Sequence, residues 1–161
     1  MKKPFTARRI VRTTTIELAA SANRVFPLFE PIGEKQWAGD WDPQMIYPPS
    51  GVAEAGAVFA VPHAGGSPAI WTIVRYDPGR FQIAYVRVEP ATHVARIDIA
   101  CAETPDGATR ADITYTFTAL TERGNAYVDT FTEQHYRAWI ASWATAINHF
   151  LRHGVALPPH A

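Results

Sequence analysis

Residues 121–153, TERGNAYVDTFTEQHYRAWIASWATAINHFLRH, decide the fold that this chain can adopt. Their large apolar side chains recur at steps of three and four residues, which keep them on one side of an α-helix. These side chains are Val128, Phe131, Tyr136, Trp139, Ile140, Trp143, Ile147, Phe150 and Leu151. We therefore predict one long amphipathic helix over the whole stretch. Because burial of each large side chain contributes about 1.5–3 kcal/mol, this helix needs an apolar surface to cover.

The rest of the chain supplies that surface as a series of strands. Residues 9–18 are rich in β-branched side chains and predict the first strand. Two short helices are expected after it, over 21–29 and over 34–38. Ser21 or Asn23 is expected to cap the first of them. Further strands, separated by turn sequences, are expected over 44–47, 58–63, 70–76, 81–88, 92–103 and 110–120. Connections this short join antiparallel neighbours. We predict an α+β protein in which a curved antiparallel sheet of about seven strands wraps around a long C-terminal helix.

The turn of the last hairpin predicts its register. Gly107 is expected to be left-handed in a three-residue turn. The turn then pairs Ile99 with Ile113, Ile97 with Tyr115, and Ala95 with Phe117. This register makes one face apolar and leaves the polar side chains on the other, as in a sheet with one solvated face.

The strands over 70–76 and 81–88 are ambiguous, because both faces of each carry apolar residues. Either Tyr85 and Arg87 or their neighbours Val86 and Val88 point inward. Pro90 is a candidate for a bulge that changes this parity.

Composition restricts the partners of the protein. Fifteen basic and fifteen acidic residues cancel, and no basic run is interleaved with aromatic residues, so we expect no nucleic-acid partner. No segment approaches the ~18 consecutive apolar residues of a membrane span, and the basic N-terminal segment lacks the apolar stretch of a signal peptide. The single cysteine, Cys101, excludes an internal disulfide and is expected to be a small buried side chain. We expect one cytoplasmic domain over 1–161, with an ordered core over 7–153 and a tail over 154–161; a homodimer is left open.

A second stretch of sequence carries a family pattern. It comprises Val25-Phe26-Pro27-Leu28-Phe29, Gly33-Glu34, Trp37, Trp41, Pro43 and Tyr47, followed later by Gly56, Phe59, Trp71, the run 115–120 and Gly124. In these residues the chain resembles the SRPBCC superfamily (START-like, polyketide cyclase/dehydrase-like proteins) over nearly its whole length, and within it a bacterial subgroup of unassigned activity. The resemblance implies the helix-grip fold with a deep hydrophobic cavity under the long helix. It implies no single reaction, because relatives include lipid carriers, hormone receptors, aromatase/cyclases and chaperone activators.

Aromatic side chains are the candidates for the walls of such a cavity. A buried indole needs a partner for its N–H group, so several of the five tryptophans are expected to line a pocket, with core packing as the alternative for each. The inward face of the last hairpin and the long helix contribute further rings. The candidate ligand contacts are Trp37, Trp41, Trp71, Tyr115, Phe117, Tyr136, Trp139 and Trp143.

Three polar residues are candidates for orienting a ligand. Glu34 lies near Trp37 and Trp41, where desolvation raises the pKa of a carboxyl group into the range of a general acid; alternatively it bonds backbone donors at a helix start or faces water. His93 is expected on the inward face, as a group that polarises a ligand carbonyl or moves a proton, or else at the solvated rim of the sheet. Arg87 joins them if its strand has the required parity. Glu34 and His93 are also weak catalytic candidates.

No metal or cofactor is expected. His149 and His153 have the spacing of two ligands to one metal, but the sequence offers no third ligand. Phosphate-binding glycine loops, nucleophile elbows and Cys-x-x-Cys motifs are absent from the sequence. We expect the protein to bind a hydrophobic or aromatic, lipid- or polyketide-like small molecule between its sheet and its C-terminal helix. The alternative is a cyclase/dehydratase- or hydrolase-like enzyme that acts in the same cavity.

Overall fold

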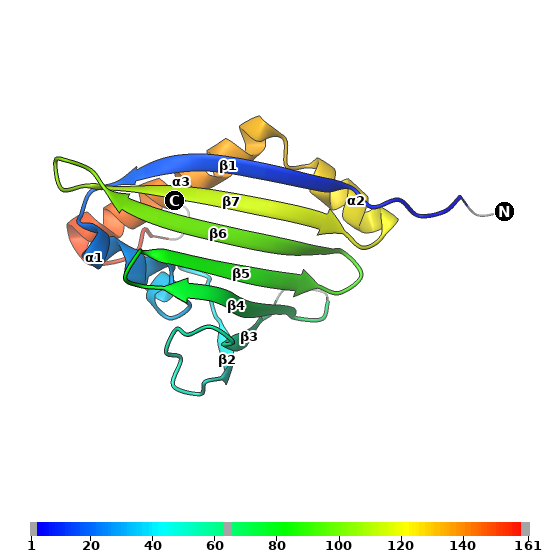
Figure 1. Ribbon diagram of the computed structural model, residues 1–161, viewed down its shortest axis with the longest axis horizontal. Coiled ribbons are helices and arrows are strands. Elements are labelled where there is room, and N and C mark those ends of the chain that lie inside the picture. Colours follow the sequence, from blue (N-terminus) through cyan, green and yellow to red (C-terminus); the bar gives the residue numbers. More distant parts are fainter. Residues whose placement is uncertain (1–2, 63–65, 159–161) are drawn as a thin grey trace.

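Seven antiparallel strands form one sheet in the computed structural model, which describes residues 3–62 and 66–158 (Figure 1). Their order across the sheet is β1-β7-β6-β5-β4-β3-β2, so that the first strand lies beside the last. The strands are β1 (Arg9–Leu18), β2 (Gln44–Tyr47), β3 (Val58–Val61), β4 (Ala69–Asp77), β5 (Gln82–Glu89), β6 (His93–Glu103) and β7 (Thr109–Ala119). The predicted α+β class and strand sequence are confirmed; β3 ends at Val61, and residues 63–65 of the predicted strand end and following turn lie outside the described residues.

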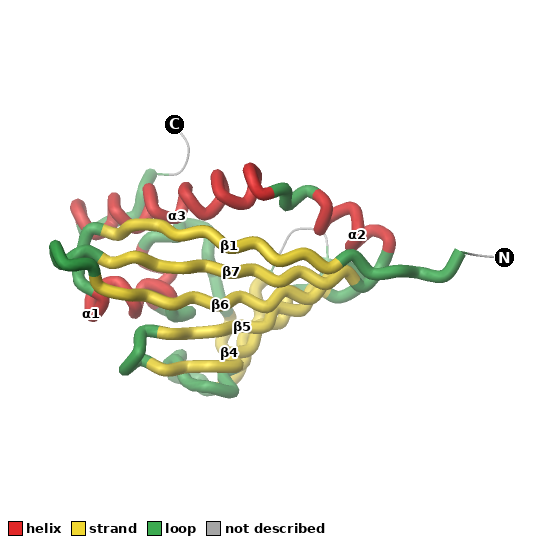
Figure 2. The backbone as a smooth tube through the Cα atoms, turned by 45° about the horizontal axis from the view of Figure 1, so that its top comes forward, coloured by secondary structure: helices red, strands yellow, loops and turns green. Residues whose placement is uncertain are grey.

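The helices lie along one side of this curved sheet, with α2 and α3 in succession along it (Figure 2). They are α1 (Ala22–Val25), the 3₁₀ helices η1 (Phe26–Phe29) and η2 (Gly33–Gln36), α2 (Glu122–Asp129) and α3 (Glu133–His153). The helix predicted over 21–29 is therefore divided in two between Val25 and Phe26. Pro27 lies in the first turn of η1, where its missing N–H group costs little. None of the helices in the described part of the chain combines the length and apolar character needed to cross a bilayer.

The C-terminal helical segment is interrupted at residues 130–132, so the prediction of a single long helix was wrong there. Thr132 begins a new helix, because its Oγ1 accepts a hydrogen bond from the backbone N–H of His135 at 3.1 Å. Arg12 of β1 donates from Nε to the carbonyl oxygen of Phe131 at 2.8 Å. Threonine hydroxyls and a side chain from the sheet thus take over backbone groups that a continuous helix would pair internally.

Helix α3 is fixed to β1 by one asparagine. Asn148 accepts at Oδ1 from the backbone N–H of Ala19 (2.8 Å) and donates from Nδ2 to the carbonyl of Glu17 (3.1 Å). At the other end of the helix, the Tyr136 hydroxyl donates to the carbonyl of Ile113 at 2.5 Å. These bonds hold the helix over the β1–β7 side of the sheet.

The predicted register of the last hairpin is confirmed. The structure pairs Ile99 with Ile113, Ile97 with Tyr115, and Ala95 with Phe117. Gly107 has the expected left-handed conformation, with φ of 83°. All six paired side chains are buried, as the apolar face of this register requires.

The structure defines which residues of β5 point inward. Tyr85 and Arg87 are buried, and β5 pairs with β6 without interruption, so Pro90 is not a bulge but part of the following turn. The register shift lies instead in β4, between Ile73 and Arg75. β4 therefore contains one extra residue, a β-bulge, next to the residues that pair with Tyr85 and Arg87.

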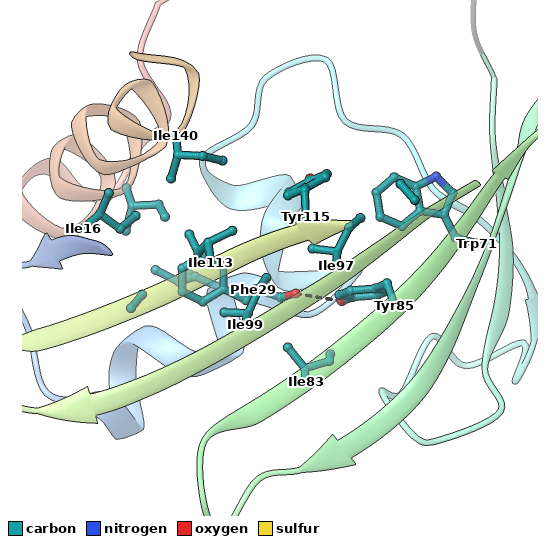
Figure 3. Close-up of a cluster of buried hydrophobic side chains, with 14 of the residues drawn as sticks. Ile16, Phe29, Trp71, Ile83, Tyr85, Ile97, Ile99, Ile113, Tyr115 and Ile140 are labelled. Atoms are coloured by element: carbon teal, nitrogen blue, oxygen red, sulfur yellow. Dashed lines mark hydrogen bonds between the residues drawn. The ribbon is translucent and has the colours of Figure 1, made fainter. Parts of the chain in front are cut away.

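Aliphatic side chains fill the space between the middle of the sheet and α3 (Figure 3). Ile97, Ile99 and Ile113 project from the sheet toward Ile140 of α3. The Tyr85 hydroxyl donates to the carbonyl of Phe29 at 2.7 Å, which ties η1 to β5. Cys101 is buried as predicted.

Helix α2 packs on the β5–β6 turn through a glycine. A Cβ atom at Gly124 would lie 1.8 Å from the carbonyl oxygen of Thr92, so this contact between backbones excludes any side chain. The same oxygen accepts a hydrogen bond from the N–H of Leu120 at 2.8 Å. The start of α2 is thereby held against the turn that precedes His93.

We expect Gly124→Ala to lower the free energy of unfolding by at least about 2 kcal/mol, because the overlap outweighs the ~1 kcal/mol that alanine gains in a helix. The control is Gly39→Ala, since nothing lies within 4 Å of a Cβ atom there. Urea unfolding of both variants tests the expectation; a Gly124→Ala protein as stable as the Gly39→Ala protein would contradict it.

Candidate functional site

A pocket of about 610 Å³ lies between the sheet, the η2 region and α3. Its size is typical of a site for a small molecule. It is lined by Glu34, Trp37, Ala38, Gly39, Asp40, Trp41, Val61, Pro62, Trp71, Arg87, Tyr115, Trp139, Ser142, Trp143 and Ala146. A recess of about 20 Å³ shares Glu34, Trp71, Tyr115 and Trp143 with this pocket and extends it toward the core.

The structure brings most of the predicted site residues together. Those that line the pocket are Glu34, Trp37, Trp41, Trp71, Arg87, Tyr115, Trp139 and Trp143. Three others lie behind its wall. Phe117 is fully buried and stacks on Phe131 at 4.5 Å, Tyr136 is bonded to the sheet, and His93 lies behind Arg87.

Two tryptophans of the wall are anchored by their indole N–H groups. Trp37 donates from Nε1 to the carbonyl of Leu28, and Trp41 donates to the carbonyl of Pro31, both at 2.8 Å. These bonds satisfy the indoles without a ligand and leave their rings available as flat surfaces. The segment between η1 and β2 therefore acts as a fixed side wall.

Helix α3 supplies the opposite wall through two tryptophans. Trp139 and Trp143 are four residues apart, and their rings meet edge to face with centroids 5.3 Å apart. Trp139 packs against Tyr115 of β7 at 5.0 Å, and Trp143 approaches Trp37 at 5.9 Å. This contact between Trp143 and Trp37 joins the two walls.

Strand β4 contributes the third tryptophan surface. Trp71 projects from the same face of the sheet as Tyr115 (Figure 3). Its ring stacks on Phe59 at 5.7 Å and meets Trp41 edge to face at 5.3 Å. Trp71 Nε1 is buried and has no hydrogen-bond partner among the described residues.

Glu34 carries the acidic group of the pocket. It lies in η2 and lines both the pocket and the recess. Burial raises its pKa from 4.5 to about 8. The carboxyl group is therefore neutral at pH 7 and can donate a hydrogen bond or a proton.

Arg87 carries the basic group. Its side chain is 9% exposed, and the guanidinium carbon lies 5.4 Å from the Trp71 ring centroid and 5.9 Å from that of Tyr115. Nη2 donates to His93 Nε2 at 2.9 Å. A guanidinium only donates, so the ring proton of neutral His93 is on Nδ1.

His93 is fully buried, so the solvated position at the sheet rim was a wrong alternative. Its ring stacks on Tyr127 at 4.5 Å, and Nδ1 lies 3.6 Å from a carboxylate oxygen of Glu89. Burial and the charge of Arg87 lower its pKa to about 4, which keeps it neutral. His93 is therefore placed to hold Arg87.

Several lining residues were not predicted from the sequence. Ser142 and Ala146 follow Trp139 by three and seven residues, a helical spacing that could have identified them as small residues on the same face. Tyr85 reaches the recess, but the sequence pattern leaves the face of its strand undefined. Asp40 lies in a loop whose path no local pattern predicts.

The described residues contain no group of three His, Cys, Asp or Glu side chains arranged to hold a metal ion. His149 and His153 pack against one another, with ring centroids 4.5 Å apart.

One known protein family matches this chain. Residues 9–147 match the family model described as polyketide cyclase / dehydrase and lipid transport. No curated protein matches the chain.

Solved structures share the fold at low sequence identity. A point mutant of norcoclaurine synthase from Thalictrum flavum, in complex with a transition-state analogue, has a TM-score of 0.67 at 15% identity, with 94% of this chain and 99% of that chain covered. An uncharacterised protein from Rhizobium leguminosarum has a TM-score of 0.61 at 17% identity, with 92% and 99% covered. The Mll3558 protein from Rhizobium loti has a TM-score of 0.61 at 16% identity, with 88% and 99% covered.

The family match extends over most of the chain, and the observed sheet, grouped around its C-terminal helix, is the helix-grip fold that the sequence pattern implied. The chain belongs to the polyketide cyclase/dehydrase and lipid transport family, within the SRPBCC superfamily.

Proposed function

We propose that the pocket binds a small hydrophobic molecule with a flat, aromatic or polycyclic body. The observation that carries this proposal is the convergence of five tryptophans and Tyr115 on one pocket of about 610 Å³. Packing with no ligand does not require so many rings at one surface, whereas a flat ligand gains contact area on each of them.

The way in which the rings are held supports the same conclusion. Trp37 and Trp41 are bonded to backbone carbonyls, and Trp139 and Trp143 project from a regular helix. Ligand binding therefore needs little ordering of side chains, which lowers its entropic cost. The family description, which includes lipid transport and polyketide cyclases, agrees with an apolar ligand.

Catalysis in this pocket is a second candidate function, favoured by one observation. Glu34 holds its proton up to about pH 8 and lines the pocket where the recess begins. An acid in this state can protonate a bound substrate. The similar fold of norcoclaurine synthase, an enzyme solved with a transition-state analogue, is compatible with this candidate.

A charged residue in the aromatic wall should weaken binding. We expect Trp143→Arg to weaken binding of 2-naphthamide, a neutral aromatic probe, by at least about tenfold, because it removes a ring surface and introduces an unpaired cation. Isothermal titration calorimetry measures the affinity, and circular dichroism verifies that the sheet is intact.

The matched control is Ala141→Arg, which places the same side chain on the exposed face of α3 and should change the affinity by no more than about twofold. A folded Trp143→Arg protein that binds the probe as well as the unmodified protein would refute the proposed function.

Replacement of Glu34 should change how stability depends on pH. The unfolded chain releases this proton near pH 4.5 and the folded protein near pH 8, so between these values folding retains a proton and the free energy of unfolding falls as pH rises. We expect Glu34→Gln to remove this loss and to be more stable than the unmodified protein at pH 8 by about 2 kcal/mol. This difference in the free energy of unfolding is smaller than the one that corresponds to the full pKa shift, because the pocket is open to water.

Urea unfolding at pH 4 and pH 8 provides the measurement, and the two proteins should agree within about 0.5 kcal/mol at pH 4. Glu17→Gln, at an exposed position of β1, is the control and should show no such pH-dependent gain. An equal effect of Glu34→Gln at both pH values would show that Glu34 is not a buried neutral acid.

A further inference from the structure

The guanidinium of Arg87 is a buried cation with no anion beside it. Arg87 belongs to none of the ion pairs formed among residues 3–62 and 66–158. An arginine side chain is always charged in proteins, so Arg87 brings a permanent positive charge to this position. A buried charge that lacks a counter-ion is unfavourable unless a partner neutralises it.

The groups around Arg87 stabilise its charge but do not neutralise it. The rings of Trp71 and Tyr115 lie 5.4 and 5.9 Å from the guanidinium carbon and act through their π-faces. His93 accepts one hydrogen bond and is neutral. Glu89, the nearest carboxylate on the same strand, approaches His93 and not Arg87.

The acidic residues of the pocket do not supply the missing anion. Glu34 and Asp40 both line the pocket, but neither forms an ion pair with Arg87. Glu34 is moreover protonated at neutral pH. Among the described residues, the pocket therefore offers Arg87 no anionic partner.

The orientation of the guanidinium is fixed before any ligand binds. His93 holds Nη2 at 2.9 Å and is itself held by its stacking on Tyr127. Nε of Arg87 is buried and has no hydrogen-bond partner among the described residues, and the same is true of Trp71 Nε1 beside it. Two N–H donors, Arg87 Nε and Trp71 Nε1, are thus left without a partner at one end of the aromatic pocket.

We propose that the ligand is an aromatic carboxylic acid, whose carboxylate pairs with Arg87 while its ring system lies against the tryptophan walls. A guanidinium matches a planar carboxylate with two parallel hydrogen bonds, and pairing within an apolar pocket makes this interaction strong. His93 is a positioning residue for Arg87. This inference rests on the proposed function, since it assigns the chemistry of the ligand in the same pocket.

Two probes of equal shape test the inference on the unmodified protein. We expect 2-naphthoate, which is ionised at neutral pH, to bind at least about tenfold more tightly than 2-naphthamide in calorimetric titrations at pH 7. If 2-naphthamide binds and 2-naphthoate binds no more tightly, the inference is overturned and the proposed function stands. If neither probe binds, the proposed function is overturned, and the inference with it.

Substitution of Arg87 assigns the preference to this residue. Arg87→Met should weaken 2-naphthoate binding at least about tenfold and change 2-naphthamide binding less than about threefold, so that the preference disappears. Arg75→Met, at an exposed position of β4, should leave both affinities unchanged. A preference that survives in a folded Arg87→Met protein overturns the inference.

A conservative variant covers the case in which Arg87→Met does not fold. Arg87→Lys keeps the charge and loses the fork of parallel donors, so we expect the preference for 2-naphthoate to fall at least about threefold. An undiminished preference in Arg87→Lys would show that the planar guanidinium does not recognise the carboxylate.

Discussion

The attachment of α3 to one side of the sheet is the constraint on which the pocket depends. Asn148 binds two backbone groups near the end of β1, and Tyr136 binds a carbonyl of β7, so the helix cannot move toward the middle of the sheet. Aliphatic side chains such as Ile140 and Ile147 fill the space between this helix and the sheet. Trp139 and Trp143 of the same helix then pack against Tyr115 of β7 and Trp37, and a hollow remains between these rings and the inward residues of β4 and β5.

Two ionisable groups of this hollow, Glu34 and Arg87, respond to burial in opposite ways. The Glu34 carboxyl group avoids an unpaired charge by keeping its proton, because its pKa can rise. Arg87 stays charged and lies among aromatic rings, and the neutral His93 accepts a hydrogen bond from it. One pocket therefore presents a neutral donor and a permanent cation, and this polarity distinguishes it from a plain apolar cavity.

Much of this architecture could be predicted from the sequence, because local patterns decide it. The glycine turn at Gly107 defined the register of the last hairpin, and helical spacing brought Trp139 and Trp143 to one face. The break at residues 130–132 was missed because threonine hydroxyls and Arg12 compete for backbone groups, and the role of Arg12 depends on a strand far away in the sequence. The inward face of Arg87 depends on the register in which β5 pairs with β6, and the burial of His93 required the packing of α2. Contacts between segments far apart in the sequence cannot be predicted from the spacing of residues within one segment.

Because all five tryptophans of the chain line one pocket, the tryptophan fluorescence of the protein arises from that pocket alone. No indole elsewhere contributes a background signal to its near-ultraviolet absorption or emission. The edge-to-face pairs in the wall are close enough to exchange excitation energy, so that whatever enters the hollow alters the emission of the entire set. The fold thus carries an intrinsic reporter of occupancy that requires no label.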